Sequence, residues 1–282
     1  MLPAPGGESL ALREWPLPAG RARAVVVMVH GLGEHAGRYE RVAARLNEWG
    51  YAACAADHHG HGASSGARGG LPSVDRLVDD LGLVVDAARA AWPGLPLVLL
   101  GHSLGGLVAA SFVVRQVRPV DALVLSSPAL DAGLGAAQKA LIALLLRIAP
   151  GVRVGNGLKA DFLSHDRAVV QAYRDDPLCH DRIGPRLARF LADEGARVQA
   201  AAPGWQVPTL LLYAGDDRLV KPAGSRAFTA AAPAAVLQAH CFASHFHEIF
   251  NESDAGAVFE ALRQWLDARW GAESLSPSAA IR

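Results

Sequence analysis

The chain has 282 residues, of which 51% are hydrophobic, so it is long enough to bury a large core in one α/β domain with an insertion. Its 27 basic and 27 acidic residues give a formal net charge of +0, which argues against a nucleic-acid partner or an anionic membrane surface. Three widely spaced cysteines, Cys54, Cys179 and Cys241, form no CxxC or Cys/His motif, and we expect them to be reduced.

Targeting signals are not apparent. Residues 1–20 lack a basic region followed by a continuous apolar stretch, which predicts a cytoplasmic location. Residues 140–148 form the nearest approach to a membrane span, but the run is too short and contains Arg147. We therefore expect a soluble protein.

The first part of the chain alternates between strand and helix patterns. The expected strands are residues 9–15, 23–29, 51–56, 97–100 and 122–125, and the expected helices are residues 38–49, 73–92 and 104–116. Residues 23–29 are β-branched and almost wholly apolar, which is typical of a strand covered on both faces. The alternation predicts an α/β fold with a mostly parallel sheet and helices on both faces.

The alternation stops between Pro128 and Pro208, where helical periods are broken by Gly and Pro without a comparable strand. It resumes with a strand over 209–213, a helix over 222–231, a strand over 236–240 and a helix over 253–270. We therefore predict a core of residues 1–127 and 208–270, a helical cap or lid at 128–207 after the sixth strand, and a tail at 271–282.

Ser103 lies in the segment LVLLGHSLGGL, residues 97–107, between an apolar strand and an apolar helix. The letters GHSLG alone are weak, because such a pattern arises often by chance in a glycine-rich chain. The strand before and the helix after them are what a nucleophile elbow needs, and Gly101 and Gly105 allow close backbone approach at a strained turn. This context predicts that Ser103 is a nucleophile.

A serine nucleophile requires a base, a carboxylate that orients the base, and donors for an oxyanion. Asp216 and Asp217 follow the strand that ends near Tyr213, and either one could instead cap a turn. His240, His245 and His247 compete for the base. The last two also have a metal-like spacing, but a third ligand is missing. Spacing leaves both choices open.

Two backbone segments are candidates for the oxyanion donors. One is the turn HGLG at residues 30–33, which an ordinary glycine turn would also explain, and the other is the N–H of Leu104, directly after the serine. We expect His102 to be structural and to point away from Ser103. We interpret the tract His58, His59, His61 as a tight loop rather than a metal site.

Several strings carry a family resemblance across nearly the whole chain. They are HGLGEHAGRY at 30–39, DHHGHGASSG at 57–66, GHSLGG at 101–106, DRLV at 217–220 and HEIFNE at 247–252. Together they resemble the monoglyceride lipase and lysophospholipase branch of the alpha/beta-hydrolase superfamily, whose members are often grouped with serine aminopeptidases. Leu104 replaces the methionine common in this branch, which leaves a backbone donor intact.

The resemblance implies an alpha/beta-hydrolase fold and a set of site residues. Ser103 would be the nucleophile, Asp217 the acid and His247 the base, and the N–H groups of Leu32 and Leu104 would form the oxyanion hole. We expect no metal and no organic cofactor. The expected reaction is hydrolysis of monoacylglycerol-like esters through an acyl-enzyme.

The segment QKALIALLLRI, residues 138–148, is apolar around much of its circumference. Burial between cap and core would explain this pattern. The functional interpretation is a lid helix in which Leu141, Leu144, Leu145 and Ile148 line an acyl channel and touch lipid aggregates.

Four alternative functions stay open. The first two are a lysophospholipase and a short-chain carboxylesterase. The third is an aminopeptidase, which would need an acidic pocket for the substrate amine. The candidates for that pocket are Asp161, Asp166, Asp175, Asp176 and Glu194. The last alternative is a non-catalytic binding module with the hydrolase fold. The sequence predicts neither acyl length nor oligomeric state.

Overall fold

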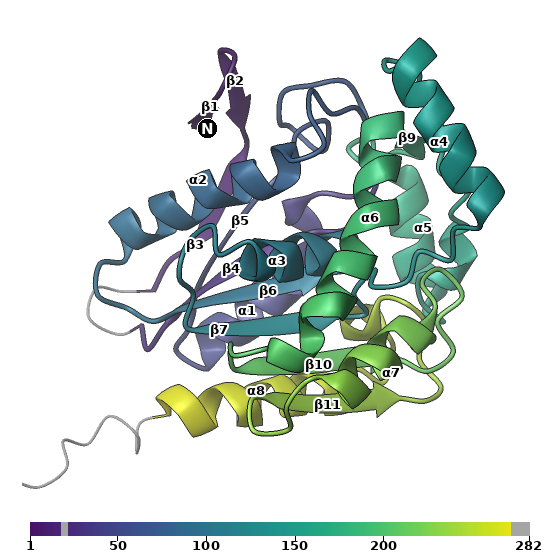
Figure 1. Cartoon of the computed structure of the whole chain (residues 1–282). Helices are drawn as coiled ribbons and strands as arrows, with labels where there is room; N and C mark the ends of the chain where they lie inside the picture. The colour runs from purple at the N-terminus through teal and green to yellow at the C-terminus, as the bar shows by residue number, and fades with distance from the viewer. Residues whose placement is uncertain (18–21, 272–282) are drawn as a thin grey trace, which may run out of the picture.

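The computed structural model describes residues 1–17 and 22–271, and its centre is a seven-stranded sheet in the order β11-β10-β7-β6-β4-β5-β3 (Figure 1). Neighbouring strands are parallel, except that β3 pairs antiparallel with β5. The strands are β3 (Leu12–Trp15), β4 (Val25–Val29), β5 (Ala52–Ala56), β6 (Leu97–His102), β7 (Ala122–Ser126), β10 (Thr209–Ala214) and β11 (Leu237–Phe242). The mostly parallel sheet was correctly predicted.

Helices cover both faces of this sheet (Figure 1). One face carries α2 (Arg76–Ala91), α3 (Leu104–Val114), α6 (Pro185–Ala201) and α7 (Pro222–Ala231), and the other carries α1 (Glu40–Glu48) and α8 (Gly256–Trp270). Strand β4 shows why two layers form. Val25, Val27 and Val29 point into the first layer, whereas Val26 and Met28 point into the second, because side chains alternate along a strand.

The N-terminal strands differ from the prediction. The loosely alternating run at 9–15 is divided between β3 and a separate hairpin of β1 (Leu2–Ala4) and β2 (Glu8–Leu10). Gly6 and Gly7 form the hairpin turn, with φ of 81° and 74° that favour glycine. The strands have three residues each, too few to show a periodic pattern.

Residues 128–207 contain α4 (Ala136–Ile148), α5 (Arg167–Asp175), α6 and the short turns η2 (Ala160–Phe162) and η3 (Ala202–Gly204). They also contain a two-residue ladder of β8 (Val154–Gly155) and β9 (Arg182–Ile183), where the sequence predicted no strand. The segment follows β7, which is the fifth strand of the central sheet along the chain rather than the predicted sixth.

Two further predictions concern the ends of the chain and membranes. The predicted tail at 271–282 lies outside the described residues except for Gly271. None of the helices in the described part of the chain combines the length and apolar character needed to cross a bilayer.

Candidate active site

The candidate residues lie on loops at one edge of the sheet. Parallel pairing sets Val29 opposite Gly101 and Ala214 opposite Phe242, so that neighbouring strands end level. In open α/β sheets, ligands bind outside these carboxyl ends. The loops after β4, β6, β10 and β11 carry Leu32, Ser103, Asp217 and His247 respectively.

Ser103 forms the turn between β6 and α3 in a strained conformation, with φ 53° and ψ −119°. Its N–H donates to the carbonyl of Ser126 at 3.0 Å. The flanking residues must be glycines because a side chain would collide with neighbouring backbone. A Cβ on Gly101 would lie 2.4 Å from the Gly105 oxygen, and a Cβ on Gly105 would lie 2.0 Å from the Val29 oxygen. The elbow therefore has the close backbone approach that the sequence predicted.

The buried side chains of Asp217 and His247 form a hydrogen bond, in which His247 Nδ1 donates to Asp217 Oδ2 at 2.6 Å. The other Asp217 oxygen accepts the N–H groups of Leu219 and Val220, each at 2.9 Å. Burial opposes ionisation of the carboxyl, but the His247 charge and these hydrogen bonds outweigh it and lower the pKa of Asp217. Burial likewise opposes protonation of His247, yet the Asp217 carboxylate raises the pKa of His247 above its usual value.

The structure places the candidates between which spacing could not choose in different surroundings. Asp216 is exposed and pairs with Arg218 at 2.9 Å, so it is not the partner of a buried histidine. His240 lies on β11 with Nε2 at 2.8 Å from Gln238 Nε2, and His245 lies 3.4 Å from Asp254. Of the three histidines, His247 alone has a hydrogen bond to Asp217.

His102 was expected to be structural and to point away from Ser103, and the structure shows in addition that it borders the site. Its ring packs against that of His247, with centroids 4.7 Å apart, and it lines the same small cavity as Ser103. Strand alternation explains this, because His102 shares a sheet face with Val98 and Leu100, and the His247 loop covers that face. Burial, together with His247, lowers the pKa of His102 to about 4, so the ring is neutral at pH 7.

The two predicted oxyanion donors border the cavity that Ser103 lines. Leu104 is the first residue of α3, where a backbone N–H has no acceptor within the helix. Leu32 lies in the loop after β4. Gly33 follows with φ 76°, and a Cβ there would lie 2.2 Å from the His180 oxygen, so this loop fits closely against the segment after α5.

A buried ionic network that sequence reasoning missed lies beside these loops. Arg38 contacts Glu248 through two hydrogen bonds of 2.6 and 2.8 Å and Glu34 through one of 2.7 Å. Glu34 also accepts the N–H of Gly31 at 2.5 Å and the hydroxyl of Tyr39 at 2.8 Å. The strings HGLGEHAGRY and HEIFNE contain these side chains, but pairing across 210 residues leaves no local signal.

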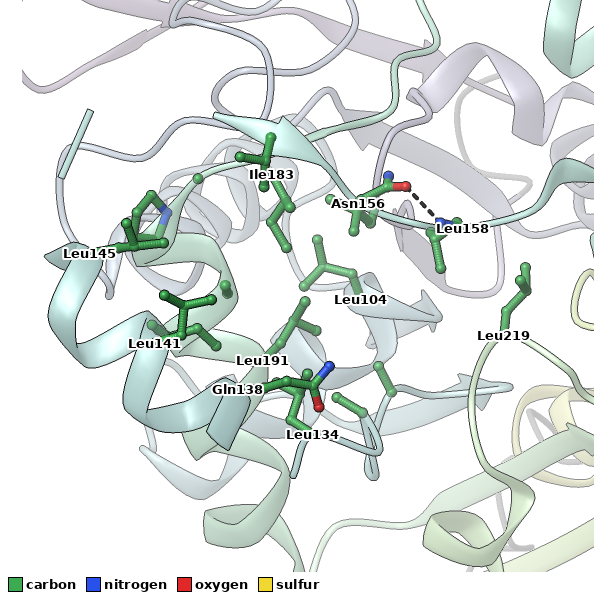
Figure 2. Close-up of a pocket in the computed structure, with 18 of the residues that line it drawn as sticks. Leu104, Leu134, Gln138, Leu141, Leu145, Asn156, Leu158, Ile183, Leu191 and Leu219 are labelled. Carbon is green, nitrogen blue, oxygen red and sulfur yellow. Dashed lines mark hydrogen bonds between the residues drawn. The ribbon is translucent and has the colours of Figure 1, made fainter. Parts of the chain in front are cut away.

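An apolar cavity of about 310 Å³ has Ser103 among its lining residues. Figure 2 shows Leu104, Leu141 and Leu145 around this cavity. Of α4, Leu141, Ile142 and Leu145 line it. Leu144 and Ile148 do not line it, and they are 52% and 67% exposed. Leu141 is also 54% exposed, so exposure alone does not separate the residues that line the cavity from those that do not. Further lining residues are Leu104, Leu134, Gln138, Asn156, Leu158, Ile183, Leu191 and Leu219.

A second cavity of about 30 Å³ also borders Ser103 and has a polar wall made by Glu34, Arg38, His102, His247 and Glu248. The two cavities share Leu32, Ser103, Leu158 and Leu219. Ser103 therefore faces a large apolar space and a small polar one, which suits a substrate with one apolar and one polar part.

The carboxylates proposed for an amine pocket border neither cavity. Each has another role in the described structure. Glu194 pairs with Arg115, Asp176 with His35 and Asp161 with Arg174, while Asp166 caps α5 and Asp175 accepts from Gln171. Glu34 and Glu248, which do line the small cavity, are both paired with Arg38.

Within the described ranges, one group has the composition of a metal site: His35, Asp176 and Cys179, whose ligand atoms lie within 4.8 Å of one another. His35 Nδ1 accepts the N–H of Gly37, so Nε2 carries the proton that it donates to Asp176 at 2.8 Å. The tract His58 to His61 forms a turn, with the His61 N–H donating to the His58 carbonyl at 2.9 Å.

Comparison with known proteins gives consistent results. The family model described as "Serine aminopeptidase, S33" (Hydrolase_4) matches residues 20–254. A monoacylglycerol lipase of Mycolicibacterium smegmatis is 35% identical over 93% of this chain and 94% of its own. A phospholipase of Bacillus subtilis is 34% identical over 90% and 98%.

A solved structure is similar over nearly its whole length. The crystal structure of a monoacylglycerol lipase of Paleococcus ferrophilus has a TM-score of 0.83 and 33% identity, covering 92% of this chain and 99% of that one. The predicted alpha/beta-hydrolase fold is thereby confirmed.

Proposed function

Since this chain belongs to the serine aminopeptidase S33 (Hydrolase_4) family, we propose that it is a serine hydrolase that cleaves monoacylglycerol-like carboxylic esters, with Ser103, His247 and Asp217 as its catalytic triad. One observation carries the proposal. A strained serine at a strand-to-helix turn borders the same cavity as a buried histidine that is hydrogen-bonded to a buried carboxylate. This is the arrangement that serine nucleophiles need for activation.

In the proposed mechanism, Ser103 Oγ attacks the ester carbonyl while His247 Nε2 takes the hydroxyl proton. Asp217 holds the imidazole in the tautomer with Nδ1 protonated and stabilises the imidazolium that forms. The N–H groups of Leu32 and Leu104 bind the oxyanion. The imidazolium then protonates the leaving alcohol. Water, deprotonated by His247, attacks the acyl-enzyme and releases the acid.

The two cavities support the proposal that the substrate is an ester with an apolar acyl chain. The apolar one of about 310 Å³ has room for an acyl chain, and the polar one of about 30 Å³ offers polar contacts to a hydroxyl group next to the ester. We propose that residues 128–207 form a cap over the core, since α4 supplies one wall of the acyl cavity. Its exposed Leu144 and Ile148 would touch lipid aggregates. The relatives named as lipases and a phospholipase support lipid esters as the substrate class.

An aminopeptidase is less well supported, despite the family's description. A free amine on the substrate needs an unpaired carboxylate near the nucleophile. Glu34 and Glu248 line the small cavity and share Arg38, and each of their oxygens already accepts a hydrogen bond, from Arg38 or from Gly31, Tyr39 or Asn251.

A paired assay tests the proposal. Purified protein is given monoacylglycerols and p-nitrophenyl esters of increasing chain length, a lysophospholipid and an aminoacyl amide, and Ser103→Ala is measured in parallel. We expect ester hydrolysis and fluorophosphonate labelling that both require Ser103. Amide hydrolysis exceeding ester hydrolysis would favour the peptidase, and absence of Ser103-dependent labelling would favour a non-catalytic module. The predicted cytoplasmic location is tested separately by cell fractionation.

A further inference from the structure

Glu34 holds the backbone of the loop after β4. Its Oε1 accepts the Gly31 N–H at 2.5 Å and the Tyr39 hydroxyl at 2.8 Å, and its Oε2 accepts from Arg38 at 2.7 Å. Gly31 immediately precedes Leu32, and a Cβ on Gly31 would lie 2.8 Å from Glu34 Oε1 and 3.3 Å from Ser103 Cβ. The carboxylate therefore fixes this backbone directly beside the serine.

Arg38 connects this loop to the histidine loop. Its guanidinium makes a two-bond contact with the Glu248 carboxylate, which also accepts from Asn251 Nδ2 at 2.9 Å. Glu248 immediately follows His247 in the chain. The side chains are buried, with exposed fractions of 11% for Arg38 and 5% for both glutamates. Buried two-bond pairs of this kind have a fixed geometry.

We propose that Glu34, Arg38 and Glu248 form a positioning unit that holds the Leu32 backbone and the His247 ring in register with Ser103, and that places net negative charge beside the imidazole. The proposal deepens the proposed function and rests on it for its catalytic consequence. The unit touches neither reacting atom in the proposed mechanism. The unit would act by aligning the Leu32 N–H and the His247 ring with each other. A displacement of such groups by about 1 Å can lower the rate roughly 100-fold.

The charge of the unit follows from its composition. One arginine and two glutamates sum to −1 when all are ionised. The groups that face His247 are Asp217 from the loop after β10, His102 from β6, and the two glutamates of the unit. Burial makes His102 neutral, so the other charges near the ring are the carboxylates and Arg38. After Asp217, both Glu248 and Glu34 contribute to the raised pKa of His247.

Two conservative variants separate charge from geometry. Glu248→Gln keeps the shape and one acceptor but removes a negative charge. Arg38→Lys keeps the charge but loses the planar two-bond contact. We expect both to lower kcat about 10-fold to 100-fold because alignment is lost. KM for a p-nitrophenyl ester should stay within about 2-fold because the acyl cavity is intact, whereas KM for a monoacylglycerol should also rise because both residues border the polar cavity. We expect Glu248→Gln alone to move the acid limb of the kcat/KM profile to lower pH.

The measurements include one that needs no substrate. The pKa of the His247 imidazole, followed by NMR, should fall in Glu248→Gln and stay near wild type in Arg38→Lys. Tyr39→Phe removes one hydrogen bond to Glu34 without changing charge, and it serves as the mild variant if the others unfold. Glu194→Gln is the matched control, because Glu194 is also buried against an arginine but lies away from both cavities.

The outcomes are distinguishable. Loss of kcat in Glu248→Gln and Arg38→Lys, with Glu194→Gln near wild type, supports the unit. Folded variants whose kcat and His247 pKa both match wild type would overturn it, even if Ser103→Ala is inactive. If the wild-type protein shows no Ser103-dependent hydrolysis, the proposed function fails instead, and the NMR titration still tests the electrostatic part.

Discussion

Replacing Asp217 by Asn should nearly abolish activity by reversing the tautomer of His247. Asp217 Oδ1 accepts two backbone N–H groups, from Leu219 and Val220. In the variant, the amide oxygen must take that position, because an NH₂ group cannot accept from two donors. The NH₂ then faces His247 Nδ1, which becomes an acceptor, so that Nε2 carries the proton. A protonated Nε2 cannot take the proton of Ser103.

The expected loss follows from this geometry. In serine triads, such an isosteric change costs about 10⁴-fold in kcat, which corresponds to about 5.5 kcal/mol of transition-state free energy. Asp217 and His247 are only 3% and 5% exposed, so water cannot easily replace the lost interaction. We therefore expect an effect near this full size rather than the small effect of a surface pair.

The assay is kcat/KM for a p-nitrophenyl ester, with thermal unfolding to confirm that the variant folds. Asp216→Asn is the matched control, because Asp216 is adjacent in sequence but exposed, and we expect its kcat/KM to be unchanged. The ring tautomer can be read from ¹⁵N chemical shifts. A folded Asp217→Asn enzyme that keeps more than about a tenth of wild-type kcat/KM would refute the reasoning.

Three further predictions concern pH, the lid helix and the elbow. The Asp217 carboxylate raises the pKa of His247, and the reaction needs His247 unprotonated. We therefore expect kcat/KM to rise with pH through a midpoint above 6.5, the ordinary pKa of histidine. A midpoint below 6.5 in a pH-rate profile would contradict this. Leu145 lines the apolar cavity, so Leu145→Glu should reduce hydrolysis of long-chain esters relative to short-chain esters. Leu144 is exposed and does not line the cavity, so Leu144→Glu should weaken hydrolysis of aggregated substrate only. Equal effects of the two variants on monomeric esters would contradict this prediction. Gly105→Ala should destabilise the fold by about 3 kcal/mol or more in chemical unfolding, since its Cβ would lie 2.0 Å from a carbonyl oxygen. Gly82→Ala is the contrasting variant: its Cβ would have only ordinary contacts beginning at 3.5 Å, and Ala is favoured over Gly inside a helix, so it should raise stability by about 0.5–1 kcal/mol.

The central fold was predictable because its signals are local. The run at residues 23–29 is apolar on both faces, and the glycines around Ser103 mark a tight turn within five residues. The short elements were not predictable. β8 and β9 have two residues each, and their pairing joins segments that are distant in sequence. A periodic pattern needs more residues than such strands contain.

The site was predictable in part. The order of Ser103, the aspartates and the histidines pointed to a triad, but the choice of Asp217 needed the resemblance, because Asp216 and Asp217 have the same chemistry. The structure distinguishes them by burial and by the 2.6 Å contact with His247. The Arg38–Glu248 contact and the packing of His102 depend on which sheet face each loop covers, and no spacing along the chain encodes that.

The burial of α3, which begins directly after Ser103, has a consequence for local unfolding. Residues 104–112 of α3 are all buried, whereas α4, which forms the opposite wall of the apolar cavity, has one buried residue, Ile142. Amide protons of α3 should therefore exchange with solvent only when the whole core opens, and those of α4 through partial openings of much lower free energy. We therefore expect Ser103, which precedes α3, to belong to a more stable cooperative unit than α4 does. Partial opening of α4 should then leave the turn at Ser103 in place.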